Sequence, residues 1–344
     1  MTLLLAAFVA GALCTWGVRA FALRMGIVNH PNGIVPQHTR PVAYLGGVGI
    51  AGGAAFFLAR GDGPGLLVGA AAFTALGIAD DLRPLPPARK LLLQGAAAAL
   101  AVACGTALPF ALPAPLGAAL AVAWIVVMVN AVNVTDVCDG LAGGLAVVAL
   151  LAVAALEPSV RVPALAVAGA TGGFLLFNRP DASIFLGDAG SHLLGFAWAA
   201  LVLEVTQGRG AWPAAPQALL LAAVPLFETA FLIARRREKG LRWWLGSPDH
   251  FALRLQSRGL GKWATDRVAW GSAAALAGVA YALEHVDALG AAILLAAAGV
   301  ALSAAWRALR RWEVPPRGAP MPAAKDARTL RPPTHAGTTA GREG

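Results

Sequence analysis

Apolar segments of membrane-spanning length recur along almost the whole sequence. The hydrocarbon core of a bilayer requires about 20 apolar residues per helix, and several of the segments fall short of that length. The sequence therefore predicts an all-α polytopic membrane protein with ten or eleven transmembrane helices. The eleven candidate segments are residues 1–23, 44–59, 65–80, 90–107, 112–130, 140–156, 162–178, 189–206, 214–234, 266–284 and 288–306.

The composition supports this reading. Hydrophobic residues make up 58% of the 344 residues and charged residues only 13%, whereas a soluble domain carries about 25% charged residues. We expect residues 1–312 to form one transmembrane domain. Residues 313–344 are basic and rich in Pro and Gly without apolar periodicity, which predicts a disordered cytoplasmic tail.

The positions of Lys and Arg predict the orientation. No basic residue precedes the first apolar segment, so we expect an anchor with its N-terminus outside rather than a removable signal peptide. With that orientation, 23 of the 27 Lys and Arg residues lie on the cytoplasmic side, as the positive-inside rule requires. We therefore expect a multi-pass protein of the cell inner membrane.

Two adjacent carboxylates, Asp80 and Asp81, end the third apolar segment at the predicted cytoplasmic boundary. Like charges at a membrane surface are costly unless a divalent cation or a cationic side chain neutralises them. A solvated helix end is the plainer alternative, but negative charge is also unfavourable at a helix C-terminus. The pair therefore favours a functional site. Gly46 and Gly47, on the same predicted side, fit either ligand approach or helix packing.

Two further polar clusters fall on that side. In the first, amides and carboxylates recur every three residues, so on a helix they form one slowly drifting polar stripe. In the second, small residues around Asp188 leave room for a bound metal or phosphate, although Asp188 could also cap the next helix. The residues of the two clusters are Asn130, Asn133, Asp136 and Asp139, followed by Asn178 and Asp188.

In this order, the motifs resemble the polyprenyl-phosphate N-acetylhexosamine-1-phosphate transferases, glycosyltransferase family 4, over roughly residues 30–260. Residues 225–229 resemble the family's Pro-x-x-Asp-Thr turn, with Glu228 in place of Asp. Residues 247–255 resemble its His-rich loop, but Ala252 and Leu253 stand where two histidines are usual. The motifs that match are Gly46-Gly47, Asp80-Asp81, Lys90 with Gln94, the run Asn130 to Gly140, and Asn178 through residues 187–191.

The resemblance implies an enzyme that transfers a sugar 1-phosphate from a UDP-N-acetylhexosamine to a polyprenyl phosphate and releases UMP. Residues 41–47 resemble the N-acetylglucosamine branch, while a phospho-N-acetylmuramoyl-pentapeptide transferase remains the alternative. The implied cofactor is Mg²⁺, with Mn²⁺ as the other candidate. We expect Asp81 and Asp188 to bind the metal, and catalytic roles for Asp80, Asp81, Asp136 and Asp139. The expected substrate-binding residues are Lys90, Asn130, Asn133, Asn178, His250 and Arg254.

Three other functions compete with this one. The net charge of +9 could indicate nucleic-acid binding, but the basic residues lack the aromatic interleaving of such a surface, so we expect no nucleic-acid partner. A transporter predicts ionisable residues near the bilayer midplane, which the segment interiors almost lack. A structural scaffold would not need four polar clusters on one face. Dimerisation through Gly and Ala faces stays open.

Overall fold

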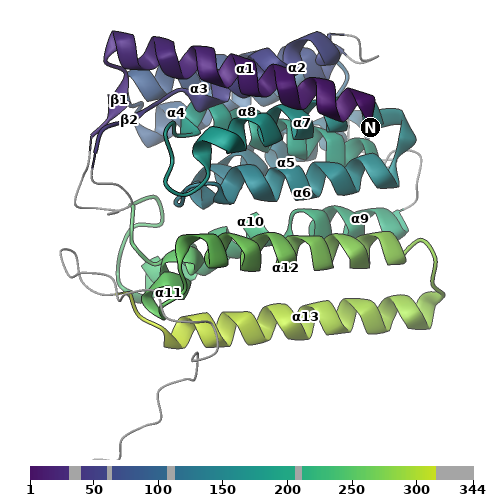
Figure 1. Cartoon of the computed structure of the whole chain (residues 1–344). Coiled ribbons are helices and arrows are strands. Elements are labelled where there is room, and N and C mark those ends of the chain that lie inside the picture. Colours follow the sequence, from purple (N-terminus) through teal and green to yellow (C-terminus); the bar gives the residue numbers. More distant parts are fainter. Residues whose placement is uncertain (31–39, 60–63, 107–112, 206–210, 315–344) are drawn as a thin grey trace, which may run out of the picture.

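The computed structural model describes residues 1–30, 40–59, 64–106, 113–205 and 211–314, a bundle of helices that lie side by side along a common direction (Figure 1). A two-stranded hairpin and the short helix α11 lie together at one end of it. The helices of the first part of the chain are α1 (Thr2–Met25), α2 (Gly46–Leu58), α3 (Pro64–Leu82), α4 (Pro87–Ala103), α5 (Ala114–Thr135) and α6 (Leu141–Leu156). They are followed by η1 (Pro158–Val160), α7 (Arg161–Asn178), α8 (Gly187–Val205), α9 (Ala211–Leu221), α10 (Ala223–Glu238), α11 (Phe251–Ser257), α12 (Lys262–Ala282) and α13 (Ala288–Arg311).

Every predicted apolar segment contains a helix, although several helices begin or end a few residues inside the predicted bounds. Segment 214–234 is broken, because α9 and α10 meet at an angle of 67°. By length and composition, five helices of the described residues can each cross a membrane, and the bent pair raises the number to six. The expected ten or eleven spans and the outward N-terminus remain predictions.

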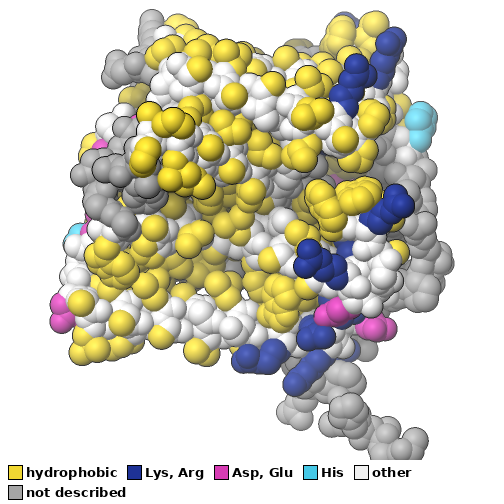
Figure 2. Space-filling view, turned by 180° about the vertical axis from the view of Figure 1, so that it is seen from behind, with side chains coloured by type: hydrophobic (Ala, Val, Ile, Leu, Met, Phe, Trp, Pro, Cys, Tyr) yellow, Lys and Arg dark blue, Asp and Glu magenta, His cyan; other side chains and the backbone are white. Residues whose placement is uncertain are grey.

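The outer helices expose apolar side chains to their surroundings. On α1, Leu5, Val9 and Leu13 are each more than half exposed, and Leu289 and Ile293 are similarly exposed on α13. In Figure 2, hydrophobic side chains cover most of the visible face, while Lys and Arg gather toward one side. Such a surface is stable in lipid and not in water, so the chain is a multi-pass membrane protein.

Helix α8 forms the centre of the bundle. Almost all of its residues from Ala189 to Leu203 are buried, and its Phe196 ring stacks on Phe73 of α3 with centroids 5.1 Å apart. Glycines bring its first turn against two neighbours: Gly47 of α2 touches the backbone of Gly190, and Gly77 of α3 touches the backbone of Asp188. A side chain at either glycine would separate the helices, so of the two interpretations of Gly47 the structure supports helix packing.

The hairpin was not predicted from the sequence. Strands β1 (Val28–Asn29) and β2 (Val42–Ala43) pair antiparallel. Strand β2 is also bonded to loop 179–186, where the Phe185 nitrogen donates to the Ala43 carbonyl at 2.9 Å. The Gly46 nitrogen in turn donates to the Phe185 carbonyl at 2.9 Å. The start of α2 and the start of α8 are thereby joined at the end of the bundle that carries the polar clusters.

Candidate active site

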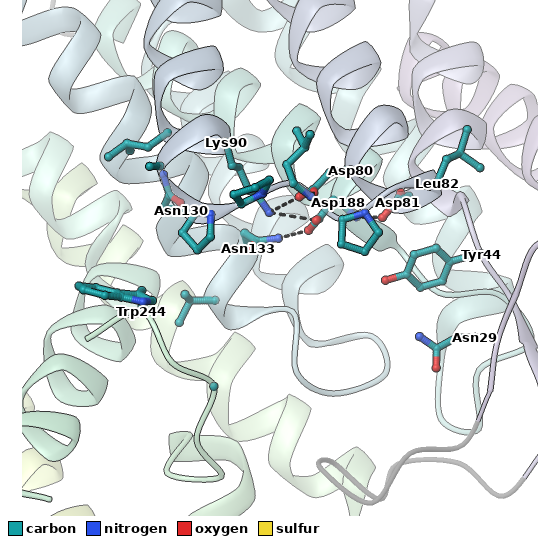
Figure 3. Close-up of a pocket in the computed structure, with 18 of the residues that line it drawn as sticks. Asn29, Tyr44, Asp80, Asp81, Leu82, Lys90, Asn130, Asn133, Asp188 and Trp244 are labelled. Carbon is teal, nitrogen blue, oxygen red and sulfur yellow. Dashed lines mark hydrogen bonds and ion pairs between the residues drawn. The ribbon is translucent and has the colours of Figure 1, made fainter. Parts of the chain in front are cut away.

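Lys90 of α4 joins two carboxylates that come from different helices. Its ammonium nitrogen lies 2.7 Å from Asp80 Oδ2 of α3 and 2.9 Å from Asp188 Oδ2 of α8 (Figure 3). Lys90 and Asp188 are 98 positions apart in the sequence. The sequence indicated that the three residues lie together only because it placed them on the same side of the membrane. The structure thus brings Asp80, Lys90 and Asp188 into one cluster.

Asp81 holds the helix from which Asp188 projects. Its two carboxylate oxygens accept hydrogen bonds from the backbone nitrogens of Asp188 at 2.7 Å and Ala189 at 3.0 Å. A carboxylate at the first turn of a helix satisfies free N–H groups and interacts favourably with the helix dipole. The cap of α8 therefore comes from α3 rather than from Asp188 itself, which leaves the Asp188 carboxylate available to the site.

Asn133 of α5 orients Asp188 from the other side. Its side-chain nitrogen donates to Asp188 Oδ1 and, at 2.9 Å, to Ser191 Oγ. One turn earlier on α5, the Asn130 amide donates to Gln94 Oε1 at 2.7 Å. Gln94 continues the chain to His192, whose other ring nitrogen contacts the Asp188 carbonyl at 2.7 Å. Both amides of the predicted stripe thus support the first turn of α8.

A cavity of about 1250 Å³ opens beside these residues. One part of its wall is polar, and another part is apolar and includes Leu91 of α4, Ile233 of α10 and the Trp243–Trp244 pair. Six of the residues expected in the site line it, namely Asp80, Asp81, Lys90, Asn130, Asn133 and Asp188. A wall of this mixed character suits a ligand that has both a charged and an apolar part.

Negative charge exceeds positive charge around the cavity. Burial, together with the carboxylates of Asp188 and Asp81, raises the pKa of Asp136 well above its ordinary value. Asp136 does not line the cavity. Burial and the same carboxylates also raise the pKa of Tyr44, so its phenol stays protonated and can donate a hydrogen bond. A cation bound in the cavity would be stabilised by these carboxylates.

The carboxylate best placed to hold a metal ion is Asp188. Its side chain is 25% exposed, compared with 6% for Asp80, whose Oδ1 accepts from the Leu85 nitrogen at 2.6 Å. Within the described part of the chain, no three His, Cys, Asp or Glu side chains form a ready metal shell. Magnesium commonly takes one or two carboxylates and completes its shell with water and phosphate oxygens. The residues fit a cation that is shared with a phosphorylated substrate, and not a closed protein cage.

Asp139 and Asn178 lie together but outside the cavity lining. The side-chain Oδ1 of Asn178 accepts a hydrogen bond from the Gly140 nitrogen at 3.0 Å, and its side-chain Nδ2 donates to the Ile184 carbonyl at 2.9 Å. Asp139 Oδ2 accepts from the Ala182 nitrogen at 3.2 Å. Asn178, expected to bind substrate, uses both ends of its amide to join the turn after α5 to the loop before α8.

His250 and Arg254 are also drawn into the protein. His250 Nδ1 lies 2.7 Å from Glu228 Oε1, and Glu228 is fully buried. The Arg254 guanidinium is 0% exposed; it pairs with Asp249 and donates to the carbonyls of Leu309, at 3.0 Å, and Trp312. The expected contact of Arg254 with the donor has no geometric support, because every bond found for its guanidinium leads to the α13 end or back to Asp249. His250 stays a predicted donor contact that the cavity does not reach.

Several cavity residues were not identified from the sequence. Tyr44 and Asn29 come from the unpredicted hairpin region, and Trp243, Trp244 and Arg236 come from the end of α10 and the loop after it. Arg236 donates to the Trp243 carbonyl at 2.7 Å, which holds that loop against the cavity. The run of basic residues at 235–239 followed by two Trp was a usable signal, since both residue types gather at membrane interfaces.

The part of the chain that carries the site is similar to known proteins. Residues 64–206, which include Asp80, Asp81, Lys90 and Asp188, match glycosyl transferase family 4. A Streptomyces coelicolor protein named as a glycosyltransferase is 33% identical over 320 residues, which cover 89% of this chain and 75% of that protein.

Two further relatives have more specific names. A Bacillus subtilis protein named as an undecaprenyl-phosphate N-acetylglucosaminyl 1-phosphate transferase is 32% identical over 64% of this chain and 66% of its own length. The phospho-N-acetylmuramoyl-pentapeptide-transferase of Listeria welshimeri is 35% identical over 43% of this chain and 46% of its own length.

Fold and site together define a helical multi-pass membrane protein. At one end of its bundle is an acidic site in which one lysine pairs with two carboxylates. The chain belongs to glycosyl transferase family 4, as the match over most of the Streptomyces relative shows.

Proposed function

We propose that the protein transfers N-acetylhexosamine 1-phosphate from a UDP-sugar to a polyprenyl phosphate at the cytoplasmic face of the inner membrane. UMP is released and a polyprenyl diphosphate sugar is formed. The Bacillus and Listeria relatives, whose names specify sugar-phosphate transferases, support the reaction class.

The observation that carries the proposal is the position of Lys90 between Asp80 and Asp188 at the wall of the cavity. Phosphoryl transfer depends mainly on in-line placement and on neutralising charge at phosphate oxygens. Lys90 is a compact positive charge that suits a phosphate oxygen, and the adjoining apolar wall of Leu91 and Ile233 suits a prenyl chain.

In the proposed reaction, an oxygen of the acceptor phosphate attacks the sugar-proximal phosphorus of the donor. A new P–O bond forms, the bond between that phosphorus and the oxygen bridging the diphosphate breaks, and UMP leaves with the bonding electrons. The second pKa of a phosphate monoester is about 6, so the acceptor is largely ionised at neutral pH. The choice between Asp80 and Asp81 as a base is therefore of secondary importance, and both carboxylates act through their charge.

A bound Mg²⁺ would lower the barrier by neutralising charge on the transferring phosphate, with Asp188 and the remaining lone pairs of Asp81 as its protein ligands. Asn133 keeps the Asp188 carboxylate in one orientation, and Asp81 keeps the backbone of Asp188 in place. Mn²⁺ satisfies the same oxygen ligands.

We favour N-acetylglucosamine as the sugar, because residues 41–47 resemble that branch of the family and the Bacillus relative carries that name. The second candidate donor is UDP-N-acetylmuramoyl-pentapeptide, which the Listeria relative's name supports. The His-rich loop does not discriminate between the two donors, because buried Ala252 and Leu253 stand where two histidines are usual.

The proposal is tested with the full-length protein in detergent, undecaprenyl phosphate, Mg²⁺ and radiolabelled UDP-N-acetylglucosamine. We expect label to move into the organic phase together with stoichiometric UMP, and EDTA to abolish the transfer. A parallel reaction with UDP-N-acetylmuramoyl-pentapeptide separates the two donors. Absence of lipid-linked product with both donors, from protein that is monodisperse, would refute the proposed function.

A further inference from the structure

Lys262, at the start of α12, bridges two segments that lie far apart in the sequence. Its ammonium nitrogen is 2.6 Å from Asp181 Oδ1 and 3.5 Å from Asp139 Oδ2. Asp139 is buried, whereas Asp181 is 80% exposed. The proximity of Lys262 lowers the pKa of Asp181, so this ion pair is formed at neutral pH.

The two bridged segments carry residues of the site. Asp139 lies in the turn that follows Asp136, and Asp181 lies in the loop that leads into α8 and Asp188. The Ala182 nitrogen already donates to the Asp139 carboxylate at 3.2 Å. Lys262 therefore closes a connection between the turn that contains Asp136 and the loop that leads into the helix of Asp188.

The face of α12 that carries Lys262 packs along the same turn. Two turns later, Trp270 Nε1 donates to the Leu141 carbonyl at 3.3 Å. Between them lies the buried Asp266, whose carboxylate oxygens find no hydrogen-bond partner among the described residues. Its Oδ2 would be 3.3 Å from a Cβ on Gly140. Asp266 therefore also faces the turn that contains Asp139 and Gly140.

From this geometry we infer that Lys262 is a positioning residue for the transfer reaction: it fixes the separation between the Asp136 turn and the first turn of α8. The inference rests on the proposed function for its kinetic consequence, but the connection itself can be measured without it. Lys262 does not line the cavity, so it acts through Asp139 and Asp181 and not by contact with substrate.

The kinetic test compares the Lys262→Met, Lys262→Arg and Asp181→Asn variants of the full-length protein. We expect Lys262→Met to lower kcat about tenfold, since small misplacements of reacting groups have large kinetic effects, with KM for both substrates within about twofold of the parent. Lys262→Arg should restore most of the rate. Arg267→Met, at an exposed basic residue of the same helix, is the matched control and should behave as the parent.

Asp181→Asn guards against the case in which Lys262→Met fails to fold, because Asp181 is exposed and its loss is tolerated structurally. We expect it to lower kcat less than Lys262→Met, and the double variant to be no slower than Lys262→Met alone. A raised donor KM with unchanged kcat would make Lys262 a substrate contact and overturn the inference. Unchanged kcat in both single variants would overturn it as well.

A second readout does not depend on catalysis. Cys138 lies next to Asp139 in the bridged turn, is buried, and is contacted by Gln256 at 3.4 Å from its Sγ. In a Cys14→Ala/Cys104→Ala background, we expect Lys262→Met to speed maleimide labelling of Cys138 several-fold, and Arg267→Met to leave it unchanged. Equal labelling in all variants would show that Lys262 does not hold the turn. If the parent transfers no sugar phosphate but the labelling changes as expected, the proposed function fails and the connection stands.

Discussion

Two ionic clusters at the same end of the bundle use similar residues in opposite ways. The cavity cluster consists of Asp80, Asp81, Lys90 and Asp188, and the loop cluster of Glu228, Lys239, Asp249, His250 and Arg254. In the cavity cluster, the Lys90 ammonium pairs with Asp80 and Asp188, while Asp81 accepts two backbone hydrogen bonds. In the loop cluster, Asp249 pairs with both Lys239, at 2.7 Å, and Arg254, and Glu228 contacts His250.

The difference lies in what completes the charge balance. The loop cluster is balanced by the protein itself, and its polar atoms are directed at one another and at backbone carbonyls. In the cavity cluster, the partly exposed Asp188 carboxylate lies beside an open volume, where an added cation or ligand can interact with it. The comparison therefore predicts that damage to the cavity cluster reduces activity, whereas damage to the loop cluster reduces stability.

The largest expected effect is that of Asp188→Asn. We expect transfer activity to fall at least about a hundredfold, since a charge that acts on the reacting phosphates is lost, while the melting temperature in detergent is unchanged or higher because repulsion among carboxylates is relieved. Asp287→Asn, at the cap of α13, is the control, since Asn caps a helix as well as Asp does. Near-normal turnover by Asp188→Asn would contradict the prediction that damage to the cavity cluster reduces activity.

Arg254→Met should have the largest effect on stability. The substitution leaves Asp249 and the carbonyls of Leu309 and Trp312 without their buried partner, and breaking a buried ion pair costs about 3 to 5 kcal/mol. Thermal melts in detergent should show the loss, with the donor KM of the surviving folded protein unchanged. A higher donor KM with an unchanged melting temperature would restore the donor-binding role that the sequence suggested.

Lys90→Arg sharpens the account of the cavity cluster. A planar guanidinium cannot replace a compact ammonium between two carboxylates without shifting them. We expect kcat to fall about tenfold and the melting temperature to stay close to that of the parent. Lys90→Gln, which removes the charge, should be slower still. A fully active Lys90→Arg variant would indicate that Lys90 supplies charge alone, without defined geometry.

The smallest expected effect is a change in the response to acid. Burial alone would raise the pKa of Asp249, but Lys239 and Arg254 outweigh it and hold that pKa below its ordinary value. Asp249 therefore stabilises the fold above about pH 4, the ordinary range of a carboxylate, and this contribution is lost as pH falls through the lowered pKa. Between pH 6 and pH 3, the melting temperature should therefore fall less in Asp249→Asn than in the parent.

Much of the helical layout could be predicted from the sequence, because in lipid a chain must satisfy its own backbone and long apolar segments then have only one structure available. The core of the site was predicted for a related reason: Asp80, Lys90 and Asp188 are polar residues at the ends of such segments. The break between α9 and α10 was not placed, because the apolar run of residues 218–227 continues across it.

The donor-binding role of Arg254 stays a prediction, but its buried partners could not be foreseen from the sequence. An arginine beside a His-rich motif has the same sequence signature whether it faces a ligand or a carbonyl, and the carbonyls of Leu309 and Trp312 are more than 50 residues away. The hairpin and α11 are too short for any periodicity to be visible. Pairing between distant polar groups was therefore the part that required coordinates.

The bare backbone contacts at Gly47 and Gly77 limit how this enzyme could be redesigned. Because these contacts hold the first turn of α8 against α2 and α3, a methyl group at either position would displace that turn and with it Asp188. Attempts to alter the proposed donor preference should leave these two glycines intact and vary the peripheral loops, whose shape can change while the interhelical spacing stays the same.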